Sequence, residues 1–475
     1  MKTILTGDDI DLAHHSGKKE IAVGPDDIVT GIAQEKAEEY GIRLVPQAQG
    51  GTGALQPEPW MPAGRSETPF AASSETLAEP PFDMQYWRKQ FPILSQYIHV
   101  ANCSQAPQST FTHDAALQYL ESWNQMGMDW DRWMDEVNQS KAEFAKIIHA
   151  DPEDIAIGTS VSELTSAVAS SLPLNTSRKK IVVTEAEFPT VGLIWQAQEK
   201  YGFQVRFLPV KSGVVDPKDY DQYVGQDTII TSACDTYYYN GFRQDLETII
   251  PKIHEKGSLV FVDAYQGIGT HPLDVRELDI DFLATGNLKY LLGVPGIAFL
   301  YVKKELVEYL HPSFTGWFGQ ENPFAFDIHR FVAAKGARRF DNGTPPVPTA
   351  YIARAGMKII NTVGVENIYR WTNALSEYCI QGALARGLEM AGPTDLRVKA
   401  PNTAIRVPGD SHDFELALRE RGIIASARND VVRVAPHFFI TRQDLDCVLD
   451  AYVDVLCKDP NSRISCDKKK CWNLA

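Results

Sequence analysis

Short apolar runs alternate with amphipathic segments along most of the chain, from Met84 onward. This alternation predicts strands and helices in βαβ order, and therefore a mostly parallel sheet covered by helices. A long helix after Pro346 leads into a smaller α+β unit. The pattern thus predicts an α/β fold with one large and one small domain. The predicted strands are residues 155–158, 180–184, 228–231, 259–262, 282–285 and 297–302 in the large domain, and 403–407 and 431–434 in the small one.

The first 81 residues show a different pattern. Residues 1–45 predict a small module, with strands at 19–23 and 42–45 around a short helix that begins near Val29 and is capped by Gly41. The next segment is rich in Pro, Gly, Ser, Ala and Glu, which is typical of a flexible linker. We therefore expect five segments: the module 1–45, the linker 46–81, the N-terminal segment and large domain 82–345, the small C-terminal domain 346–457 and the tail 458–475.

Composition places the chain among soluble globular proteins, with 475 residues, 44% hydrophobic and 23% charged. The net charge is −15, from 46 basic and 61 acidic residues, which argues against binding nucleic acid. No apolar stretch is long enough for a transmembrane helix, and Asp8, Asp9 and Asp11 interrupt any signal-peptide core, so we expect no membrane partner. Five of the seven cysteines lack metal-ligand spacing, and the close pair Cys466 and Cys471 has no second pair beside it, so we expect no metal site. Reduced thiols in the cytoplasm fit this pattern.

Two residues that follow apolar runs carry the candidate chemistry. Asp263 ends the run that starts at Ser258, and Lys289 lies further along in a turn rich in Gly and Pro. A lysine can hold an aldehyde as a Schiff base, and a buried carboxylate can keep a pyridine nitrogen protonated so that the ring accepts electrons. The pair therefore fits a pyridoxal phosphate site, although on the residues alone such a lysine is more often a solvated strand end.

From about Phe82 to Cys457 the chain resembles the class V aminotransferase family, which includes kynureninases, cysteine desulfurases, C–S lyases and isopenicillin N epimerase-like proteins. Several separated motifs carry the resemblance, among them the run 263–266 (Asp-Ala-Tyr-Gln) and the run around Lys289. The resemblance implies a fold type I architecture, pyridoxal 5′-phosphate as cofactor and a small amino acid as substrate. It also implies that Lys289 holds the cofactor and serves as the base at Cα, while Asp263 pairs with the pyridine nitrogen.

Further cofactor-binding positions follow from the same resemblance. The run 158–165 comes after a strand and opens a helix predicted at 163–172, where free N–H groups and hydroxyls suit an anion. The resemblance places Val161 and Ser162 at the cofactor's phosphate, and Ser162 is also a candidate N-cap. It places Phe188 against the cofactor ring and Gln266 at the 3′ oxygen. On the residues alone, an ordinary capped helix and a core phenylalanine remain open.

Arg433 alternates with apolar residues on a predicted buried strand and therefore needs an anionic partner. The resemblance makes it the clamp for the substrate's α-carboxylate, with Ser104 on the substrate side, and a structural ion pair is the alternative. Trp317 and Thr344 lie in segments that resemble parts of kynureninases reaching into the neighbouring subunit's site. The resemblance therefore implies a homodimer, in which Trp317 walls the substrate pocket and Thr344 touches the phosphate.

Departures from the family's sequence patterns narrow the set of reactions that we expect of this protein. Gln266 stands where kynureninases usually carry His, and Leu288 replaces a Tyr or His, so that one polar function is missing or supplied from elsewhere. No cysteine lies in the segments 426–430 or 343–377, which argues against the persulfide chemistry of cysteine desulfurases. We therefore expect a lyase or hydrolase of the kynureninase or C–S lyase kind, with an aminotransferase or epimerase as the alternative.

A non-catalytic alternative is a protein of this fold that has lost turnover and is recruited to an assembly. Joint retention of Lys289, Asp263 and Arg433 argues against it. The segments 17–21 and 41–45 resemble short N-terminal segments on enzymes associated with bacterial microcompartments. That resemblance implies a cytoplasmic protein placed within such a compartment.

Overall fold

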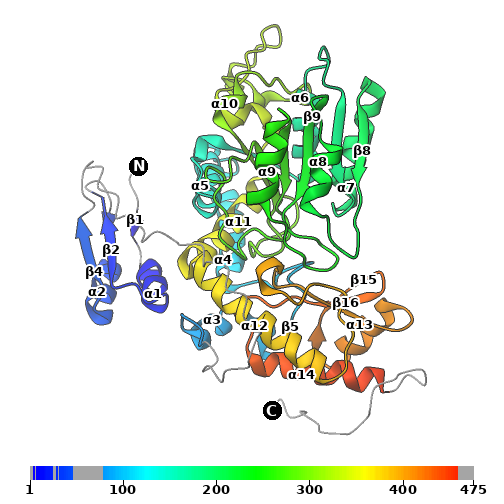
Figure 1. The fold of residues 1–475 in the computed structure, drawn as a ribbon. Helices are drawn as coiled ribbons and strands as arrows, with labels where there is room; N and C mark the ends of the chain where they lie inside the picture. Colours follow the sequence, from blue (N-terminus) through cyan, green and yellow to red (C-terminus); the bar gives the residue numbers. More distant parts are fainter. Residues whose placement is uncertain (1–3, 6, 25–27, 30, 47–78, 458–475) are drawn as a thin grey trace. The chain divides into compact units, whose positions relative to one another are not determined.

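The structure is a computed structural model that describes residues 4–5, 7–24, 28–29, 31–46 and 79–457. The chain forms two compact units, Met1–Tyr86 and Trp87–Ala475, and each is described by itself (Figure 1). The predicted tail, and the predicted linker apart from its ends, lie outside the described residues. The division into five segments therefore stays a prediction.

The N-terminal unit contains two pairs of parallel strands and two helices. Its elements are β1 (Ile4–Leu5) paired with β3 (Ile28–Val29), β2 (Glu20–Val23) paired with β4 (Arg43–Pro46), α1 (Gly7–His15) and α2 (Gly31–Tyr40). Gly41 ends α2 at φ 66°, and the Ile42 N–H donates to the Ala37 carbonyl at 2.8 Å. Ile42 belongs to a small apolar core with Ile10 and Ala33. The predicted strands and glycine cap of this segment are thus confirmed, and the unit has a core of its own.

The second unit is organised around a seven-stranded sheet in the order β6-β12-β11-β10-β9-β7-β8. The strands are β6 (Ile155–Gly158), β7 (Lys180–Thr184), β8 (Gln204–Leu208), β9 (Thr228–Cys234), β10 (Leu259–Asp263), β11 (Phe282–Gly286) and β12 (Ala298–Val302). All pairs are parallel except those of β12, which runs antiparallel to both neighbours. The six predicted strands are confirmed. The sequence reading missed β8, an edge strand whose outer residues are polar.

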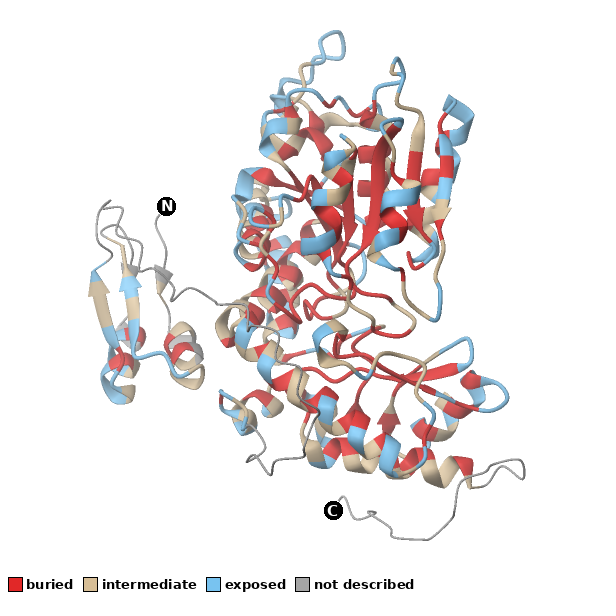
Figure 2. Ribbon diagram, in the orientation of Figure 1, coloured by how far each residue is buried: buried red, intermediate tan, exposed pale blue. Residues whose placement is uncertain are grey.

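Helices cover the sheet, and the strands between them are almost wholly buried (Figure 2). The helices of this part are α4 (Thr110–Met126), α5 (Trp130–Ile147), α6 (Val161–Ser171), α7 (Pro189–Gln196), α8 (Pro217–Tyr223), α9 (Leu246–Glu255), α10 (Lys304–Val307) and α11 (Val347–Val363). The predicted long helix after Pro346 is α11, and it packs against α4 and α5 rather than against the small sheet. The continuous apolar runs of the parallel strands therefore reflect burial on both faces.

The C-terminal part is the predicted α+β unit. Its three-stranded antiparallel sheet has the order β13-β16-β15, and a short strand, β14, pairs with β5 from the beginning of the unit. The elements are β5 (Ile98–His99), β13 (Thr403–Arg406), β14 (Ile423–Ile424), β15 (Ser426–Arg428), β16 (Val431–Val434), α3 (Met84–Lys89), α12 (Val365–Ala385), α13 (Ser411–Arg419) and α14 (Arg442–Leu456). Both predicted strands, β13 and β16, are confirmed.

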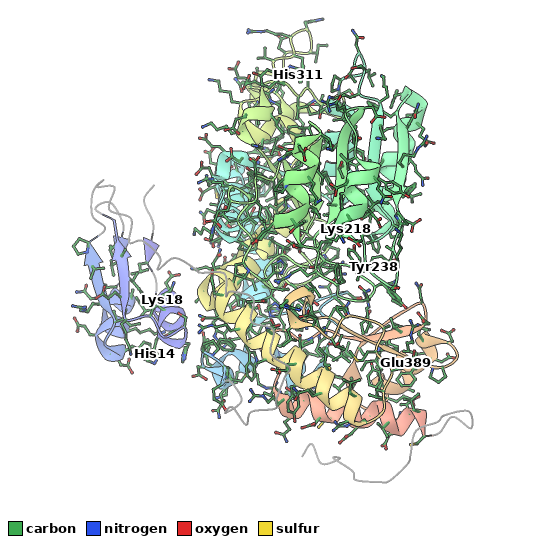
Figure 3. All side chains as sticks on the ribbon, in the orientation of Figure 1. His14, Lys18, Lys218, Tyr238, His311 and Glu389 are labelled. Atoms are coloured by element: carbon green, nitrogen blue, oxygen red, sulfur yellow. The ribbon has the colours of Figure 1, made fainter. Side chains whose placement is uncertain are left out.

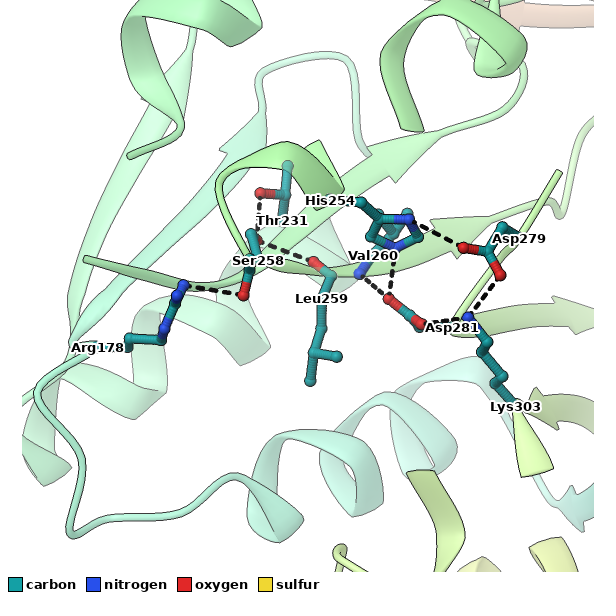
Figure 4. Close-up of polar contacts among 10 residues, drawn as sticks. Arg178, Thr231, His254, Ser258, Leu259, Val260, Asp279, Asp281 and Lys303 are labelled. Atoms are coloured by element: carbon teal, nitrogen blue, oxygen red, sulfur yellow. Dashed lines mark hydrogen bonds and ion pairs between the residues drawn. The ribbon is translucent and has the colours of Figure 1, made fainter. Parts of the chain in front are cut away.

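Asp281 fixes the start of the central strands (Figure 4). Its Oδ2 accepts the Val260 N–H at 2.8 Å and contacts His254 Nε2 at 2.9 Å, joining the loop before β11 to β10 and α9. The contact with Asp281 raises the pKa of His254. Because Val260 belongs to the strand that ends at Asp263, this network sets where that carboxylate lies.

Lys399 is a buried cation in the C-terminal part, with 2% of its surface exposed. Its Nζ donates to the carbonyls of Ala400 and Asn402 at 3.0 and 2.7 Å, and no described residue forms an ion pair with it. Burial lowers the pKa of Lys399 to about 8. A charge enclosed in this way destabilises the fold while it is protonated.

We expect the stability of the protein to depend on this lysine and on pH. Between pH 8 and the ordinary lysine pKa the unfolded chain binds the proton and the folded chain releases it, so stability rises with pH there. Below that window the buried charge of Lys399 lowers the free energy of unfolding by about 3 kcal/mol. Melting temperatures from pH 7 to 10 should therefore rise more for the wild type than for Lys399→Met. The exposed-lysine control Lys218→Met should keep the wild-type profile, and parallel profiles for wild type and Lys399→Met would contradict the expectation.

No helix in the described part of the chain has the length and apolar character needed to cross a membrane. Among those same residues, no cluster of His, Cys, Asp and Glu is arranged to hold a metal ion. Four cysteines, Cys103, Cys234, Cys379 and Cys447, are free thiols. Cys457 is disulfide-bonded, so the expectation of reduced thiols is wrong at that position.

Candidate active site

A pocket of about 380 Å³ opens where the large sheet meets the small one. Tyr238, one of its lining residues, lies between the two sheets in Figure 3. Its lining contains eight of the ten predicted site residues: Ser104, Val161, Ser162, Phe188, Asp263, Gln266, Lys289 and Arg433. Several of these residues follow the carboxyl ends of parallel strands, the usual position for ligands in such sheets.

Lys289 follows β11 and points into this pocket rather than into solvent. Its Nζ lies 4.1 Å from the centre of the Tyr265 ring and 5.9 Å from that of Phe188, and no described residue hydrogen-bonds to it. Enclosure by these side chains lowers the pKa of Lys289 to about 8, although Asp263 acts in the opposite direction. The amine is therefore neutral in a larger fraction of molecules than a surface lysine, as a nucleophile requires.

Gly286, the last residue of β11, makes room for the Tyr265 ring. A Cβ at this position would lie 2.1 Å from the tyrosine hydroxyl, so any larger residue would displace the ring. Because Lys289 lies against the same ring, the glycine positions the lysine indirectly.

Asp263 ends β10 and is 4% exposed. Its Oδ1 accepts the Tyr265 N–H at 2.9 Å. Burial raises the pKa of Asp263, while this hydrogen bond and the nearby Lys289 amine lower it. A carboxylate held in this way is ready to pair with a cation that enters the pocket.

Glu187 is a second buried acid beside Asp263 that the sequence reading missed. Its Oε1 accepts a hydrogen bond from the Ser232 hydroxyl at 2.8 Å, and its Oε2 has no partner among the described residues. Burial, followed by repulsion from Asp263, raises the pKa of Glu187 well above its usual range. Glu187 therefore keeps its proton more readily than Asp263, whose pKa is lowered by the Tyr265 N–H and the Lys289 amine.

The N-terminus of α6 differs from its prediction. The helix begins at Val161, two residues early, and its N-cap is Ser160, whose hydroxyl accepts the Glu163 N–H at 3.2 Å. The expectation that Ser162 is the N-cap is therefore wrong, because Ser160 has the extended backbone that capping requires. Val161 and Ser162 instead lie in the first turn, where backbone N–H groups have no partner within the helix.

Three residues line the pocket around the expected position of the cofactor ring: Phe188, Gln266 and Leu288. Phe188 caps α7 and is 43% exposed although it lines the pocket, and its ring meets Tyr238 edge-on with centroids 5.3 Å apart. Gln266 donates from Nε2 to the Cys103 carbonyl at 3.0 Å, and its buried Oε1 has no partner in the described chain. Leu288 also lines the pocket, so no polar group comes from that position.

Arg433 lies on β16 at the other wall of the pocket and is 1% exposed. Its Nη2 donates to Ser104 Oγ at 2.9 Å and to Ser426 Oγ at 2.6 Å, and its Nη1 donates to the Tyr238 carbonyl at 2.6 Å. No described carboxylate pairs with it. The alternative of a structural ion pair is therefore wrong for the described chain, and a buried guanidinium without an acid favours an anionic ligand.

Trp317 and Thr344 do not line this pocket. Trp317 begins a 3₁₀ turn and packs against Trp130 and Phe324, with ring centroids 5.8 and 5.7 Å apart. Thr344 is exposed in the loop before α11. Their expected roles at a neighbouring subunit's site stay predictions.

Several pocket residues had no sequence signal. Cys103 and Cys234 both line the pocket, and Cys234 donates its thiol to the Thr236 carbonyl at 3.1 Å. Burial raises the pKa of Cys234 well above its ordinary value, so this thiol stays protonated. Arg428 lines the pocket from β15. Cys234 and Arg428 reach the pocket through the strands β9 and β15, and Cys103 reaches it through the turn that also carries Ser104.

The pocket residues fit pyridoxal phosphate. Lys289 offers an unbonded amine, Asp263 a carboxylate, Phe188 an exposed ring face, and the first turn of α6 offers free N–H groups for a phosphate. The buried, unpartnered Oε1 of Gln266 is a further polar atom on the pocket wall. Each group that the cofactor needs is thus present on one cavity.

Comparison with known proteins agrees with this geometry. The family model described as aminotransferase class-V matches residues 97–442. An uncharacterized aminotransferase, YcbU, of Bacillus subtilis is 36% identical over 366 residues, 77% of this chain and 96% of the relative. A kynureninase of Pseudomonas fluorescens is 25% identical over 65% of this chain and 74% of the relative.

Solved structures share the fold. The apo structure of a cysteine desulfurase from Thermococcus onnurineus NA1 matches with a TM-score of 0.71 at 21% identity, covering 78% of this chain and 97% of that one. The cystine C–S lyase C-DES, in complex with its reaction product cysteine persulfide, matches with a TM-score of 0.70 at 20% identity, covering 76% and 99%.

The chain belongs to the class V aminotransferase family. It has the fold of a type I pyridoxal-phosphate enzyme and is a pyridoxal-phosphate-dependent enzyme. This membership argues against the alternative of a scaffold without turnover. The family match begins at residue 97, so it says nothing about the N-terminal segment, and the expected microcompartment association has no support from these comparisons.

Proposed function

We propose that this enzyme acts on a small α-amino acid, as a lyase or hydrolase of the kynureninase or C–S lyase kind. The observation that carries the proposal is the environment of Arg433. Its guanidinium is buried, has no acid partner in the described chain and lies on the same pocket as Lys289 and Asp263. A substrate α-carboxylate would supply the missing charge.

Each pocket residue has a role that follows from its position. Pyridoxal phosphate, when bound, supplies the electron sink for the carbanion that forms at the substrate's Cα. Lys289 Nζ takes the Cα proton, and its lowered pKa suits it to return that proton near neutral pH. Asp263 holds the charge of the pyridine nitrogen, and Glu187 stays neutral beside it. Arg433, with the hydroxyls of Ser104 and Ser426, orients the carboxylate.

The expected reaction type draws on both the pocket and the relatives. Two thiols line the cavity, but Cys234 is held as a protonated thiol and the hairpin 426–430 has no cysteine. This arrangement supports cleavage at the substrate's side chain over transfer of sulfur to a protein cysteine. The 36% identity with a protein named as an aminotransferase supports transamination as the second candidate.

Product analysis tests the proposal. The holoenzyme is incubated with a panel of amino acids, with and without a 2-oxo acid acceptor, and the products are separated. Release of alanine or pyruvate without the acceptor supports cleavage, whereas a new amino acid formed only with the acceptor supports transamination. Cys103→Ala should retain activity, and loss of sulfide release in that variant would favour a persulfide mechanism instead.

We also propose that the enzyme works as a homodimer. Apolar side chains in the segment that follows Trp317 are exposed, including Phe326 at 73% and Ile328 at 91%. The Trp317 and Phe326 rings stack with centroids 6.3 Å apart, so the tryptophan is continuous with this exposed patch. Contiguous exposed apolar surface of this kind supports contact with a second protein surface.

Complementation between two impaired variants tests whether Trp317 acts across the dimer. Lys289→Ala and Trp317→Ala, unfolded and refolded together, should form mixed dimers in which one of the two sites has both residues intact. Random pairing would restore about one quarter of wild-type activity, while each variant alone stays impaired. Activity no higher than the average of the separate variants would contradict a role across the interface, and sedimentation showing an active monomer would contradict the dimer.

A further inference from the structure

The substrate side of the pocket carries two arginines and no carboxylate. Arg433 lies deep in the pocket on β16, and Arg428 lies on the adjacent strand β15 and also lines the pocket. The acid that lines the pocket is Asp263, at the end of the large sheet. Since the proposed function uses Arg433 for the α-carboxylate, Arg428 is a second positive group without an assigned partner.

Strand geometry explains why Arg428 faces the pocket. Residues two apart on a strand share a face, and β15 places Ser426 and Arg428 on the same side. Ser426 is on the pocket side, because its hydroxyl touches both Arg433 Nη2 and Ser104 Oγ at 2.6 Å. Arg428 therefore extends this polar wall toward solvent, where it is exposed.

The acids near Arg428 are engaged elsewhere. Asp430 accepts the Tyr239 hydroxyl at 2.5 Å and pairs with Arg406. Glu415, the other acid next to β15, accepts the Ala427 N–H at 3.0 Å and pairs with Arg419 at 3.2 Å.

No hydrogen bond or ion pair joins the Arg428 guanidinium to any residue in the described ranges. The side chain thus keeps all its donors for a ligand. In a protein of net charge −15, an unpaired arginine on a ligand pocket differs from its surroundings, and it would attract an anion.

We propose that Arg428 binds a second anionic group, which lies on the substrate's side chain. The preferred substrate is then an α-amino acid whose side chain ends in a carboxylate or sulfinate. This inference rests on the proposed function. A planar guanidinium at the mouth can bind such a group through two parallel hydrogen bonds while Arg433 holds the α-carboxylate. Selection between acidic and neutral side chains would then come from one residue.

Spectral titration of the holoenzyme tests this role without requiring turnover. The change in the cofactor's visible absorption is followed as L-aspartate, L-cysteine sulfinate or the neutral isostere L-asparagine is added. We expect at least one acid to bind about tenfold or more tightly than asparagine. Arg428→Gln should remove this preference, and Arg428→Lys should keep part of it. Aspartate and cysteine sulfinate serve as separate arms that distinguish carboxylate from sulfinate.

The control is Arg276→Gln, which makes the same change in net charge at an exposed arginine outside the pocket lining and should keep the preference. Equal binding of acids and asparagine by the wild type would overturn the inference while leaving the proposed function intact. A preference that survives in Arg428→Gln would overturn the assignment to this residue. If no amino acid changes the spectrum, the proposed function fails first and this inference falls with it.

Discussion

Replacing Lys289 by alanine is expected to abolish covalent attachment of pyridoxal phosphate and to reduce turnover by at least about 10⁴-fold, the upper end of what one positioned proton-transfer group contributes. The variant should still fold, because the amine forms no hydrogen bond with the described residues. Its melting temperature without cofactor should stay at or above the wild-type value. Removing an amine whose pKa is lowered by enclosure relieves a cost to the fold.

Two measurements check this expectation together. Borohydride treatment followed by peptide mass spectrometry should find the reduced cofactor on the peptide that contains Lys289 in the wild type and on no peptide in Lys289→Ala. Lys218→Ala, an exposed lysine at the start of α8, is the matched control and should keep both adduct and activity. An adduct on another lysine with normal turnover would show that Lys289 has been misassigned.

The second large effect on turnover is expected from substitution of Asp263, one of the two buried acids, and not from the same substitution of Glu187. Asp263→Asn preserves shape but removes the anion that would face the pyridine nitrogen, so turnover should fall by about 10² to 10³. Glu187→Gln makes the same chemical change next to it. It should retain most activity, because burial and the nearby Asp263 favour the neutral form of Glu187 and the amide imitates that neutral acid.

Steady-state kinetics of both variants, with bound cofactor measured by absorption, separates the alternatives. Comparable losses in the two variants would mean that the acids share the charge. A larger loss in Glu187→Gln would mean that their roles are exchanged. Loss of the cofactor itself from Asp263→Asn would place the effect in binding rather than in the chemistry.

The sequence predicted the parts of this molecule that depend on local pattern. Parallel strands buried on both faces are continuous apolar runs, so six of the seven strands of the large sheet were found, and the polar edge strand β8 was missed. Site residues that follow strand ends, such as Asp263 and Lys289, came from the same pattern together with the family resemblance.

The sequence could not predict the site residues that are brought together by the packing of distant segments. Glu187 lies beside Asp263 only because β7 and β10 flank β9 in the sheet. Arg428 joins the pocket only because β15 pairs with β16. The start of α6 depended on which of two serines has an extended backbone, and the sequence does not distinguish Ser160 from Ser162.

The Asp281 network has a consequence for how this enzyme tolerates substitution. Asp281 holds β10 at Val260, three residues before Asp263 and about 10 Å from it along the strand. A change there touches no ligand, yet it would let the strand slide or tilt and carry Asp263 with it. The regions most sensitive to engineering or to chance mutation therefore include the far end of the sheet, and distance from the pocket is a poor guide to what can safely be altered.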